Sequence, residues 1–357
     1  MIDIGARNLP PRPSRGRGHV FPSFRLTLIA ASACLSALFV AACAPSSAEA
    51  PGAEQWSSIE LEIQPAELGA ERVGALIFRG GLELSSGDAN FGGLSGLEIL
   101  DGANLLAITD SGSWFRAELL FDANGALIGL DAPHLAPMRD EAGELFENKT
   151  AADAEGLAQL PDGRFAVSFE QSQTIRIYDL NRDGPIAAAH PGPRLSEVAQ
   201  LPPNQGLEAL AAAEAGDLVI GAEGARGPTQ VWRAPLGASE EIAPIARYRL
   251  SLGYALVGLD RLPDGAFVAL ERAYAPVLGA RTRIARFVES ELGAGESIET
   301  EQLAHLGAAL ALDNFEAIAA AQLSDGTTRL YILSDDNFSD SQRTLLYAFD
   351  IDQSVDD

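Results

Sequence analysis

Cysteine is almost absent from this sequence. The two cysteines, Cys34 and Cys43, lie near the N-terminus, and none follows position 43. A disulfide framework, thiol catalysis and cysteine-ligated zinc are therefore excluded for the rest of the chain. Histidine is also scarce, since the chain has only four. They are far apart in sequence and form no H-x-x-x-H pair. We therefore expect no histidine-based metal site, and a metal ion would need oxygen ligands.

Positive charge is scarce too. The chain contains 25 Lys and Arg against 50 Asp and Glu, a formal net charge of −25. Without residues 1–42, which hold five Arg and one Asp, 20 basic and 49 acidic residues remain, a net charge of −29. Such a surface repels nucleic acid and anionic lipid headgroups. It suits a soluble protein outside the cytoplasm and can attract divalent cations, although colloidal solubility explains the bulk charge equally well.

Aromatic residues form only 7% of the sequence, whereas Gly (35) and Pro (20) are plentiful. This balance favours many short strands and turns over a helical bundle. The sequence also lacks a P-loop, a G-x-G-x-x-G motif and a G-x-S-x-G nucleophile elbow. Base catalysis would therefore have to come from carboxylates, or from a histidine carried by a loop.

No apolar run near the N-terminus reaches the roughly 20 residues that a membrane-spanning helix needs. The run at 26–40 follows Arg12, Arg15, Arg17 and Arg25 and has the length of a signal-peptide core. It ends in Val40-Ala41-Ala42-Cys43, which resembles the lipobox of bacterial lipoproteins. The resemblance implies that Cys43 becomes the lipidated N-terminus; the alternative is ordinary cleavage beside an incidental cysteine.

The N-terminal pattern leads to a domain prediction. We expect a signal peptide at 1–42, a flexible tether at 43–56 and one domain at 57–352. The aspartate that commonly retains lipoproteins at the inner membrane is missing after the cysteine, which favours the outer membrane. The expected protein is a monomer on the periplasmic side of the envelope. It contacts the membrane by its lipid anchor only, and it binds a small molecule and no nucleic acid.

One sequence unit recurs five times after residue 90. It consists of a short apolar strand, a turn that is often Asp-Gly, a second apolar strand that ends in an acid, and a third strand. The copies recur at roughly 50–60 residues, the size of a four-stranded propeller blade. The last copy lacks a fourth strand, which the segment 74–84 can supply, closing the ring. We therefore predict an all-β propeller with five visible four-stranded repeats. A sixth blade built around 59–84 stays open, and a sandwich or an open solenoid fits the even spacing less well.

Acidic residues recur at fixed places in this unit. Five of them end the second strand, namely Asp110, Glu170, Glu223, Glu271 and Asp335. Three more begin the first strand, namely Glu155, Glu208 and Glu316. The two strands are antiparallel, so both positions lie at the same end of the blade. Ser95 and Val257 occupy the first-strand position in the other two copies. Glu98 and Asp260 lie three residues further on, which places them on the opposite strand face unless a bulge intervenes.

A ring of carboxylates without His or Cys suits Ca²⁺. The predicted metal ligands are Glu155, Glu208, Glu316, Glu170, Glu223 and Asp335. Asp110, Glu271 and the neighbouring Arg272 are predicted to bind a ligand, with Arg272 available to an anionic group. The alternative for each acid is a structural bond to backbone N–H groups of the next blade. The segment 179–184 also fits half of a calcium loop, but position 190 is His instead of Glu, which favours an ordinary turn.

Several of these segments together resemble the phytase-like family, described by its esterase-like activity of phytase. They are Phe91–Leu97, Asp153–Leu157, Asn204–Glu208, Gly258–Gly265 with Glu271-Arg272, Asn314–Glu316, Ser334–Phe338 and Gln342–Leu346. The resemblance spans about 74–351. It implies an exported propeller linked to phosphate-ester hydrolysis, and within its motifs Asn204, Asn314 and Asp336 are expected to face the ligand. The R-H-G-x-R-x-P signature of histidine-acid phytases is absent.

Two functions of different class follow. The first is a metal-assisted phosphoesterase or esterase, in which carboxylates hold Ca²⁺ and an activated water attacks a small phosphorylated or ester substrate. The second is a non-catalytic propeller that binds a small ligand or a partner protein. The recurrent acids favour the first function, whereas the scarce histidine and the missing nucleophile motif favour the second. The sequence does not decide whether the protein is an enzyme.

Overall fold

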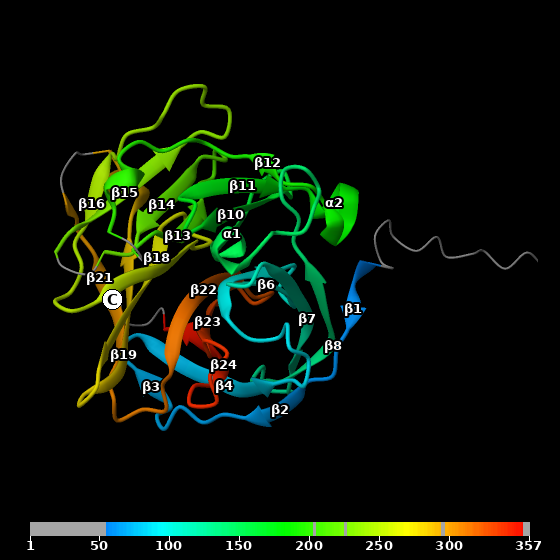
Figure 1. Ribbon diagram of the computed structural model, residues 1–357. Helices are drawn as coiled ribbons and strands as arrows, with labels where there is room; N and C mark the ends of the chain where they lie inside the picture. The colour runs from blue at the N-terminus through cyan, green and yellow to red at the C-terminus, as the bar shows by residue number, and fades with distance from the viewer. Residues whose placement is uncertain (1–54, 203–204, 225–226, 294–296, 353–357) are drawn as a thin grey trace, which may run out of the picture. The chain divides into compact units, whose positions relative to one another are not determined.

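The computed structural model describes residues 55–202, 205–224, 227–293 and 297–352, and their regular structure is nearly all β. Five sheets surround a central axis (Figure 1). The predicted propeller with five repeats is confirmed. The predicted signal peptide, the lipidation of Cys43 and almost all of the tether lie outside the described residues. No helix in the described part is long and apolar enough to span a membrane.

Each sheet is one blade, and its strands follow one another outward from the inner strand at the axis. Blade 1 consists of β5 (Leu94–Leu100), β6 (Asn104–Thr109), β7 (Ser113–Phe121), β8 (Leu127–Pro137) and β1 (Ser57–Ser58). Blade 2 consists of β9 (Ala154–Gln159), β10 (Phe165–Phe169), β11 (Thr174–Tyr178) and β12 (His190–Pro191). Blade 3 consists of β13 (Leu207–Ala212), β14 (Leu218–Ala222), β15 (Thr229–Ala234), β16 (Ala246–Tyr248) and β20 (Ser297–Ile298).

The last two blades follow the same plan. Blade 4 consists of β17 (Ala255–Arg261), β18 (Phe267–Ala275), β19 (Gly279–Phe287) and β21 (Glu301–Leu306). Blade 5 consists of β22 (Asn314–Gln322), β23 (Thr328–Asp335), β24 (Thr344–Ile351), β4 (Leu76–Ser85) and β2 (Glu62–Pro65), with β3 (Arg72–Val73) against β4. The helical segments are short: α1 (Lys149–Ala152), α2 (Leu180–Asp183), η2 (Gly184–Ile186), η3 (Val198–Gln200) and η4 (Glu289–Glu291).

The ring is closed by pairing the N-terminal part of the chain with its C-terminal part. Strand β4 pairs antiparallel with β24 from Leu84↔Thr344 to Leu76↔Ile351. The predicted closing strand at 74–84 is therefore observed, one or two residues away from its expected bounds. The open question of a sixth blade is also answered, since 59–84 contributes strands to blade 5 and no blade of its own. Closure leaves no free sheet edge at the junction.

Two segments that follow strands of blade 2 form short helical turns. The segment 194–201 contains the 3₁₀ turn η3, and the outer edge of blade 2 is the two-residue β12. The calcium-loop-like segment forms α2, in which the Asp179 side chain accepts a bond from the Arg182 N–H at 3.0 Å. Asp179 therefore acts as a helix cap, and Asp183 forms an ion pair with Arg182.

Every inner strand carries a β-bulge at the same position. In β9 the register with β10 shifts between Val167 and Phe169, and the other four inner strands shift at the equivalent place. The extra residues are Ser95, Glu155, Glu208, Val257 and Glu316. A bulge changes the direction of a side chain relative to strict alternation. This repeated irregularity sets which side chains point into the channel.

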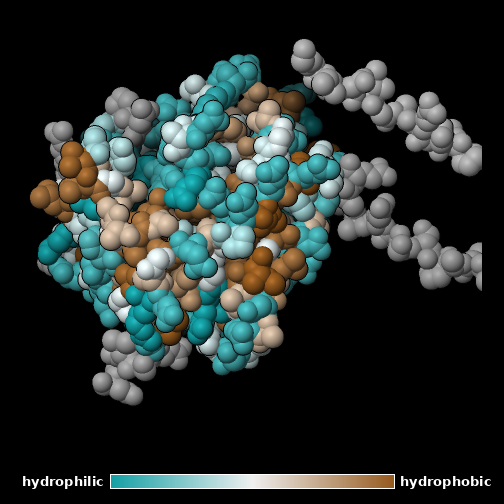
Figure 2. Space-filling model, turned by 90° about the horizontal axis from the view of Figure 1, so that it is seen from below, coloured by the Kyte–Doolittle hydropathy of each residue, from teal (hydrophilic) through white to brown (hydrophobic). Residues whose placement is uncertain are grey.

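The core lies between neighbouring blades. Between blades 1 and 2, for example, the fully buried Trp114 packs edge-on against Tyr178, with ring centroids 5.2 Å apart. Such sheet-to-sheet packing fixes the blades around the axis. On the face shown in Figure 2, hydrophobic residues reach the surface in several small groups among hydrophilic ones.

Candidate metal centre at the channel mouth

The channel opens at one end into an acidic hollow, here called the rim pocket. Its volume is about 450 Å³. It is lined by eight carboxylates and two cations, together with Thr150, Gln171 and Asn337. The carboxylates are Asp110, Asp153, Glu155, Glu170, Glu208, Glu223, Glu316 and Asp335, and the cations are Lys149 and Arg272. All six predicted metal ligands thus lie in one pocket; their binding of a metal stays a prediction.

Two sets of equivalent positions build this pocket. The first is the bulge position of each inner strand, occupied by acids in blades 2, 3 and 5. The second is the second-strand residue that directly follows the partner of the residue before the bulge, namely Asp110, Glu170, Glu223, Arg272 and Asp335. Blades 1, 2, 3 and 5 therefore place an acid at this position, whereas blade 4 places an arginine there.

The sequence alignment of blade 4 was wrong by one residue. Glu271 pairs with Leu256 in the register where Ala222 pairs with Leu207 in blade 3, so the equivalent of Glu223 is Arg272. Glu271 is fully buried inside the sheet, and its carboxylate accepts bonds from Arg283 and from the Tyr248 hydroxyl at 2.8 Å. Its predicted ligand role is thus not supported by its position.

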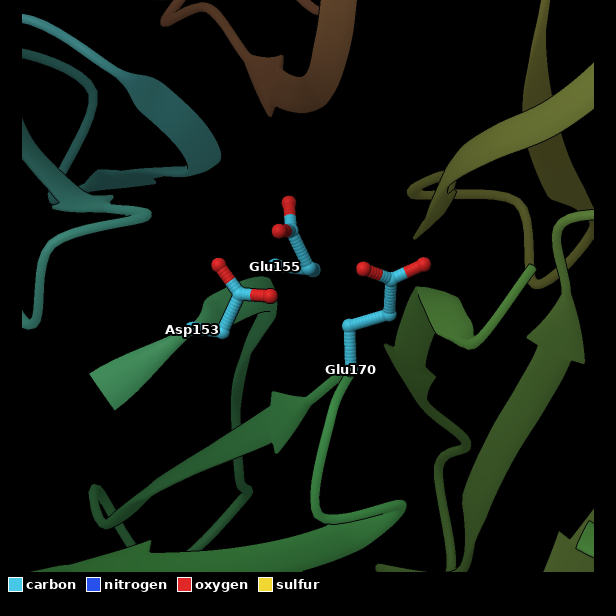
Figure 3. Close-up of side chains that lie close together, drawn as sticks. All are labelled: Asp153, Glu155 and Glu170. Atoms are coloured by element: carbon cyan, nitrogen blue, oxygen red, sulfur yellow. The ribbon is translucent and has the colours of Figure 1, made fainter. Parts of the chain in front are cut away.

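Three carboxylates come closest to a metal-binding arrangement. Asp153 precedes β9, Glu155 is its bulge residue and Glu170 follows β10. One oxygen from each lies within 4.8 Å of the other two, and the three side chains face a common space (Figure 3). Oxygens at 2.3–2.6 Å from one Ca²⁺ are separated by no more than about 5 Å, so the three fit a single ion. This buried acidic cluster can hold a metal ion.

Asp153 was not among the predicted ligands. It lies two residues before Glu155, inside the segment Asp153–Leu157 that carries part of the family resemblance. Its backbone carbonyl accepts the Glu170 N–H at 2.9 Å, which fixes the two residues side by side. The position of Asp153 just before the strand was therefore a signal that the sequence offered. Only the fold shows that its side chain reaches the rim pocket.

Burial makes the rim acids hard to ionise. Burial raises the pKa of Glu155 well above its usual value, and the charges of Glu316 and Asp153 raise it further. Burial and then Glu316 raise the pKa of Asp335 to about 9. Burial raises the pKa of Glu223 to about 7, although the positive charge of Arg272 opposes the shift. A divalent cation would remove this penalty by compensating the negative charge.

Two acids at the bulge positions also have few hydrogen-bond donors. In the described part of the chain, no donor reaches the carboxylate of Glu155 or Glu208. Burial raises the pKa of Glu208 well above its usual value, and nearby Glu223 adds to the shift. The structural alternative, a bond to a backbone N–H of the next blade, applies to Glu170, which accepts the Gly206 N–H at 3.2 Å.

Arg272 is held among the carboxylates of blades 3 and 5. Its Nη1 donates to Glu316 and to Asn314 Oδ1, both at 2.5 Å, and its Nη2 lies 3.3 Å from Glu223. Burial lowers the pKa of Arg272, but Glu316, Glu208 and Glu223 raise it by more, so the net shift is upward. The guanidinium stays charged and compensates part of the surrounding negative charge.

Lys149 forms the opposite wall. It begins α1, whose first turn is capped by Asn148, and it forms an ion pair with Asp110 and a looser one with Asp153 at 3.6 Å. Burial raises the pKa of Asp110, and Lys149 opposes the shift. Lys149 is the more exposed of the two pocket cations, since 58% of its side chain is accessible against 24% for Arg272.

Other predicted residues have different places. Asp336 accepts bonds from the Gly93 N–H at 2.9 Å and the Thr344 hydroxyl at 3.0 Å, so it ties blade 1 to blade 5. Asn204 lies outside the described residues. Glu98 and Asp260 line a second pocket, together with residues of all five blades, at the other end of the channel. The sequence analysis placed them on the opposite strand face unless a bulge intervened, and a bulge does intervene, which restores an even offset.

Comparison with known proteins now adds to this geometry. The family model described as phytase-like, with esterase-like activity of phytase, matches residues 89–338. The chain belongs to this family. A search of curated proteins gives no match.

Solved structures similar to this phytase-like protein share little sequence with it. A putative gluconolactonase is 12% identical, with 83% of this chain and 94% of that chain covered and a TM-score of 0.40. A protein of unknown function from Dyadobacter fermentans is 14% identical, with 84% and 96% covered and a TM-score of 0.41. An α-L-arabinofuranosidase from Podospora anserina is 10% identical, with 83% and 96% covered and a TM-score of 0.45.

Proposed function

We propose that this phytase-like propeller is a metal-assisted ester hydrolase, which binds Ca²⁺ in the rim pocket and acts on a small phosphate or carboxylic ester. The observation that carries the proposal is the approach of Asp153, Glu155 and Glu170 within 4.8 Å. Hard oxygen ligands without His or Cys suit Ca²⁺. The family description, with its esterase-like activity, supports the reaction class.

The position of each pocket residue suggests its role in the proposed reaction. Asp153, Glu155 and Glu170 would hold the ion, which would polarise the ester oxygen and lower the pKa of a bound water. Glu208 and Glu223 lie on the next blade, where a carboxylate with a raised pKa can accept a proton from the attacking water. Arg272 would orient an anionic group of the substrate and stabilise the negative charge that develops.

A non-catalytic role is the second candidate. Both cations of the rim pocket already have carboxylate partners, Lys149 with Asp110 and Arg272 with Glu316. This favours a pocket in which the metal is structural and the protein binds a ligand without turnover. In either case we propose that the protein is a monomer, anchored by lipid on the periplasmic side of the outer membrane.

Steady-state hydrolysis separates the candidates. Purified mature protein is assayed with p-nitrophenyl phosphate and p-nitrophenyl acetate, in Ca²⁺ and then in excess chelator. The hydrolase proposal expects turnover that chelator abolishes and Ca²⁺ restores. Glu155→Gln should lower kcat by at least about a hundredfold, as loss of one key group does in related sites. The matched variant Glu240→Gln, at an exposed position away from the pocket, should keep full activity.

The contrary outcomes are distinct. No turnover of either ester in the presence of Ca²⁺ rejects the hydrolase proposal. If Ca²⁺ then still raises the melting temperature of the native protein but not that of Glu155→Gln, the structural-metal alternative is supported.

A further inference from the structure

A second hollow, here called the inter-blade groove, lies between blades 1 and 2. Its volume is about 490 Å³, slightly larger than that of the rim pocket. It is lined by the end of β5 and the start of β6, with parts of β7 and β8, and by the end of β9 and the start of β10. The rim pocket lies at the opposite ends of these inner and second strands. The groove is therefore separate from the proposed hydrolytic site.

The floor of the inter-blade groove is apolar. Leu105, Leu106 and Phe165 are no more than 3% exposed, and partly buried Leu100 and Leu180 extend the floor. Concave sites with an apolar floor and a few polar groups are typical of small-molecule binding.

Arg116 stands in the groove without an oxygen partner. Its guanidinium lies over the ring of Trp56, 4.3 Å from the centroid. Among the described residues, no carboxylate or carbonyl reaches its N–H groups. Burial removes part of the hydration of Arg116 and lowers the pKa of its guanidinium. A guanidinium stacked in this way keeps its edge free for a bidentate acceptor.

Negative charge lies beside it and is also unpaired. Glu118 follows two residues later on β7, so it shares a strand face with Arg116 at about 7 Å between Cα atoms. Glu118 and Asp101 both line the groove, and neither forms an ion pair with any residue that the structure describes. Arg116 and Glu118 are same-face neighbours that do not pair, because the arginine is stacked on Trp56.

We infer that the inter-blade groove binds a small zwitterion with an apolar side chain, that is, an amino acid or a short peptide. Its carboxylate would pair with Arg116, its ammonium group with Glu118, and its side chain would cover the apolar floor. An anion alone would be repelled by Glu118 and Asp101, and a cation alone would leave Arg116 unpaired. The zwitterion satisfies both charges at once.

Tryptophan fluorescence gives a selective readout. Trp114 and Trp232 are fully buried, so a ligand in the groove changes chiefly the emission of Trp56. The native protein is titrated with L-phenylalanine and with two analogues that each lack one charge, 3-phenylpropionate and phenethylamine. We expect a saturable change with L-phenylalanine and at least about tenfold weaker binding of both analogues. Calorimetric titration measures the same affinities independently of the fluorophore.

Variants test the assigned residues. Arg116→Met should weaken L-phenylalanine binding at least about tenfold, whereas Arg249→Met, which removes an exposed arginine of another blade, should leave it unchanged. If Arg116→Met does not fold, Glu118→Gln serves in its place, because the exposed position tolerates the change. Glu118→Gln should weaken L-phenylalanine binding and leave 3-phenylpropionate binding equal or stronger.

Three results would overturn the inference. They are no saturable binding of L-phenylalanine up to its solubility, binding of 3-phenylpropionate as tight as that of L-phenylalanine, and unchanged binding by folded Arg116→Met. Turnover of esters does not enter these tests, so they stand apart from the proposed hydrolytic function.

Discussion

At the scale of single residues, the rim pocket concentrates more negative charge than its two cations compensate. Burial makes this costly, and the raised pKa values of Glu155, Glu208, Glu223 and Asp335 express the cost. In the metal-free protein these groups are stabilised in their protonated form. The same geometry therefore couples protonation, metal binding and stability.

The pH dependence of stability follows from this coupling. The folded pKa values of Glu223, about 7, and Asp335, about 9, lie above their ordinary values of 4.5 and 3.8. Between about pH 4 and pH 9, the folded state thus binds more protons than the unfolded state. The stabilisation is complete below about pH 4 and is lost as pH rises through 7 to 9. We predict that the melting temperature of chelated protein, measured by circular dichroism, falls from pH 5 to pH 9.

Calcium should change that profile. Because the ion competes with protons for the same oxygens, its stabilisation should be larger at pH 9 than at pH 5. An equal rise in melting temperature at both pH values would contradict the assignment of the rim acids as ligands. The exposed-site variant Glu240→Gln should follow the profile of the native protein.

Arg272 makes a separate prediction at this scale. Replacing it with Met removes the charge that compensates Glu223 and Glu316 and leaves both carboxylates buried. Breaking a buried ion pair costs about 3–5 kcal/mol, and the partial exposure of this pair places the expected loss near the lower end. The loss of unfolding free energy, measured in urea, should be larger at pH 8 than at pH 5, because Glu223, whose pKa is raised to about 7, protonates at the lower pH. Arg249→Met, which breaks an exposed pair, should change stability by less than about 1 kcal/mol.

At the scale of elements, the five inner strands show what the sequence could predict. Their spacing and turn signals were sufficient for the blades, because local apolar patterning recurs in every copy and an Asp-Gly turn recurs in four of the five. The bulges were not visible, since a bulge depends on the pairing partner and not on the strand alone. That is why the sequence left the face of Glu98 open and why Glu271 was aligned in place of Arg272.

The residue after each bulge is small for a packing reason. These residues are Gly96, Gly156, Ala209, Gly258 and Ala317. A Cβ atom on Gly156 would lie 2.6 Å from Ser168 Oγ and 2.7 Å from the Glu208 carbonyl of the next inner strand. The strands therefore approach too closely at this point for a larger side chain.

Substitution of Gly156 tests this packing. Gly156→Ala should lower the free energy of unfolding by about 1–3 kcal/mol through overpacking, and Gly156→Val should lower it more. Urea denaturation provides the measurement. Gly237→Ala is the matched control, because a Cβ at Gly237 meets no atom within 4 Å. A neutral Gly156→Ala would show that the inner strands can separate without cost.

At the scale of the whole molecule, closure of the ring joins distant parts of the chain. Asp350 on β24 accepts bonds from Arg79 on β4 at 2.5 Å and from Arg329 on β23 at 2.6 Å. The same blade supplies Glu316 and Asp335 to the rim pocket. The arrangement of the candidate site thus depends on a strand that contributes no residue to it.

Truncation separates closure from the rest of the fold. Among the described elements, removing all residues through Ser58 deletes the outer strand β1 alone, whose loss exposes one short edge. Removing residues through Ser85 deletes β4 and leaves the whole of β24 as an unpaired edge. We predict that the first truncation keeps a single cooperative thermal transition and the second does not, with self-association through the exposed strand. Calorimetry and sedimentation measure the two effects. A monomeric, cooperatively folded protein lacking β4 would mean that the other four blades hold the ring, and the rim pocket, without the closing strand.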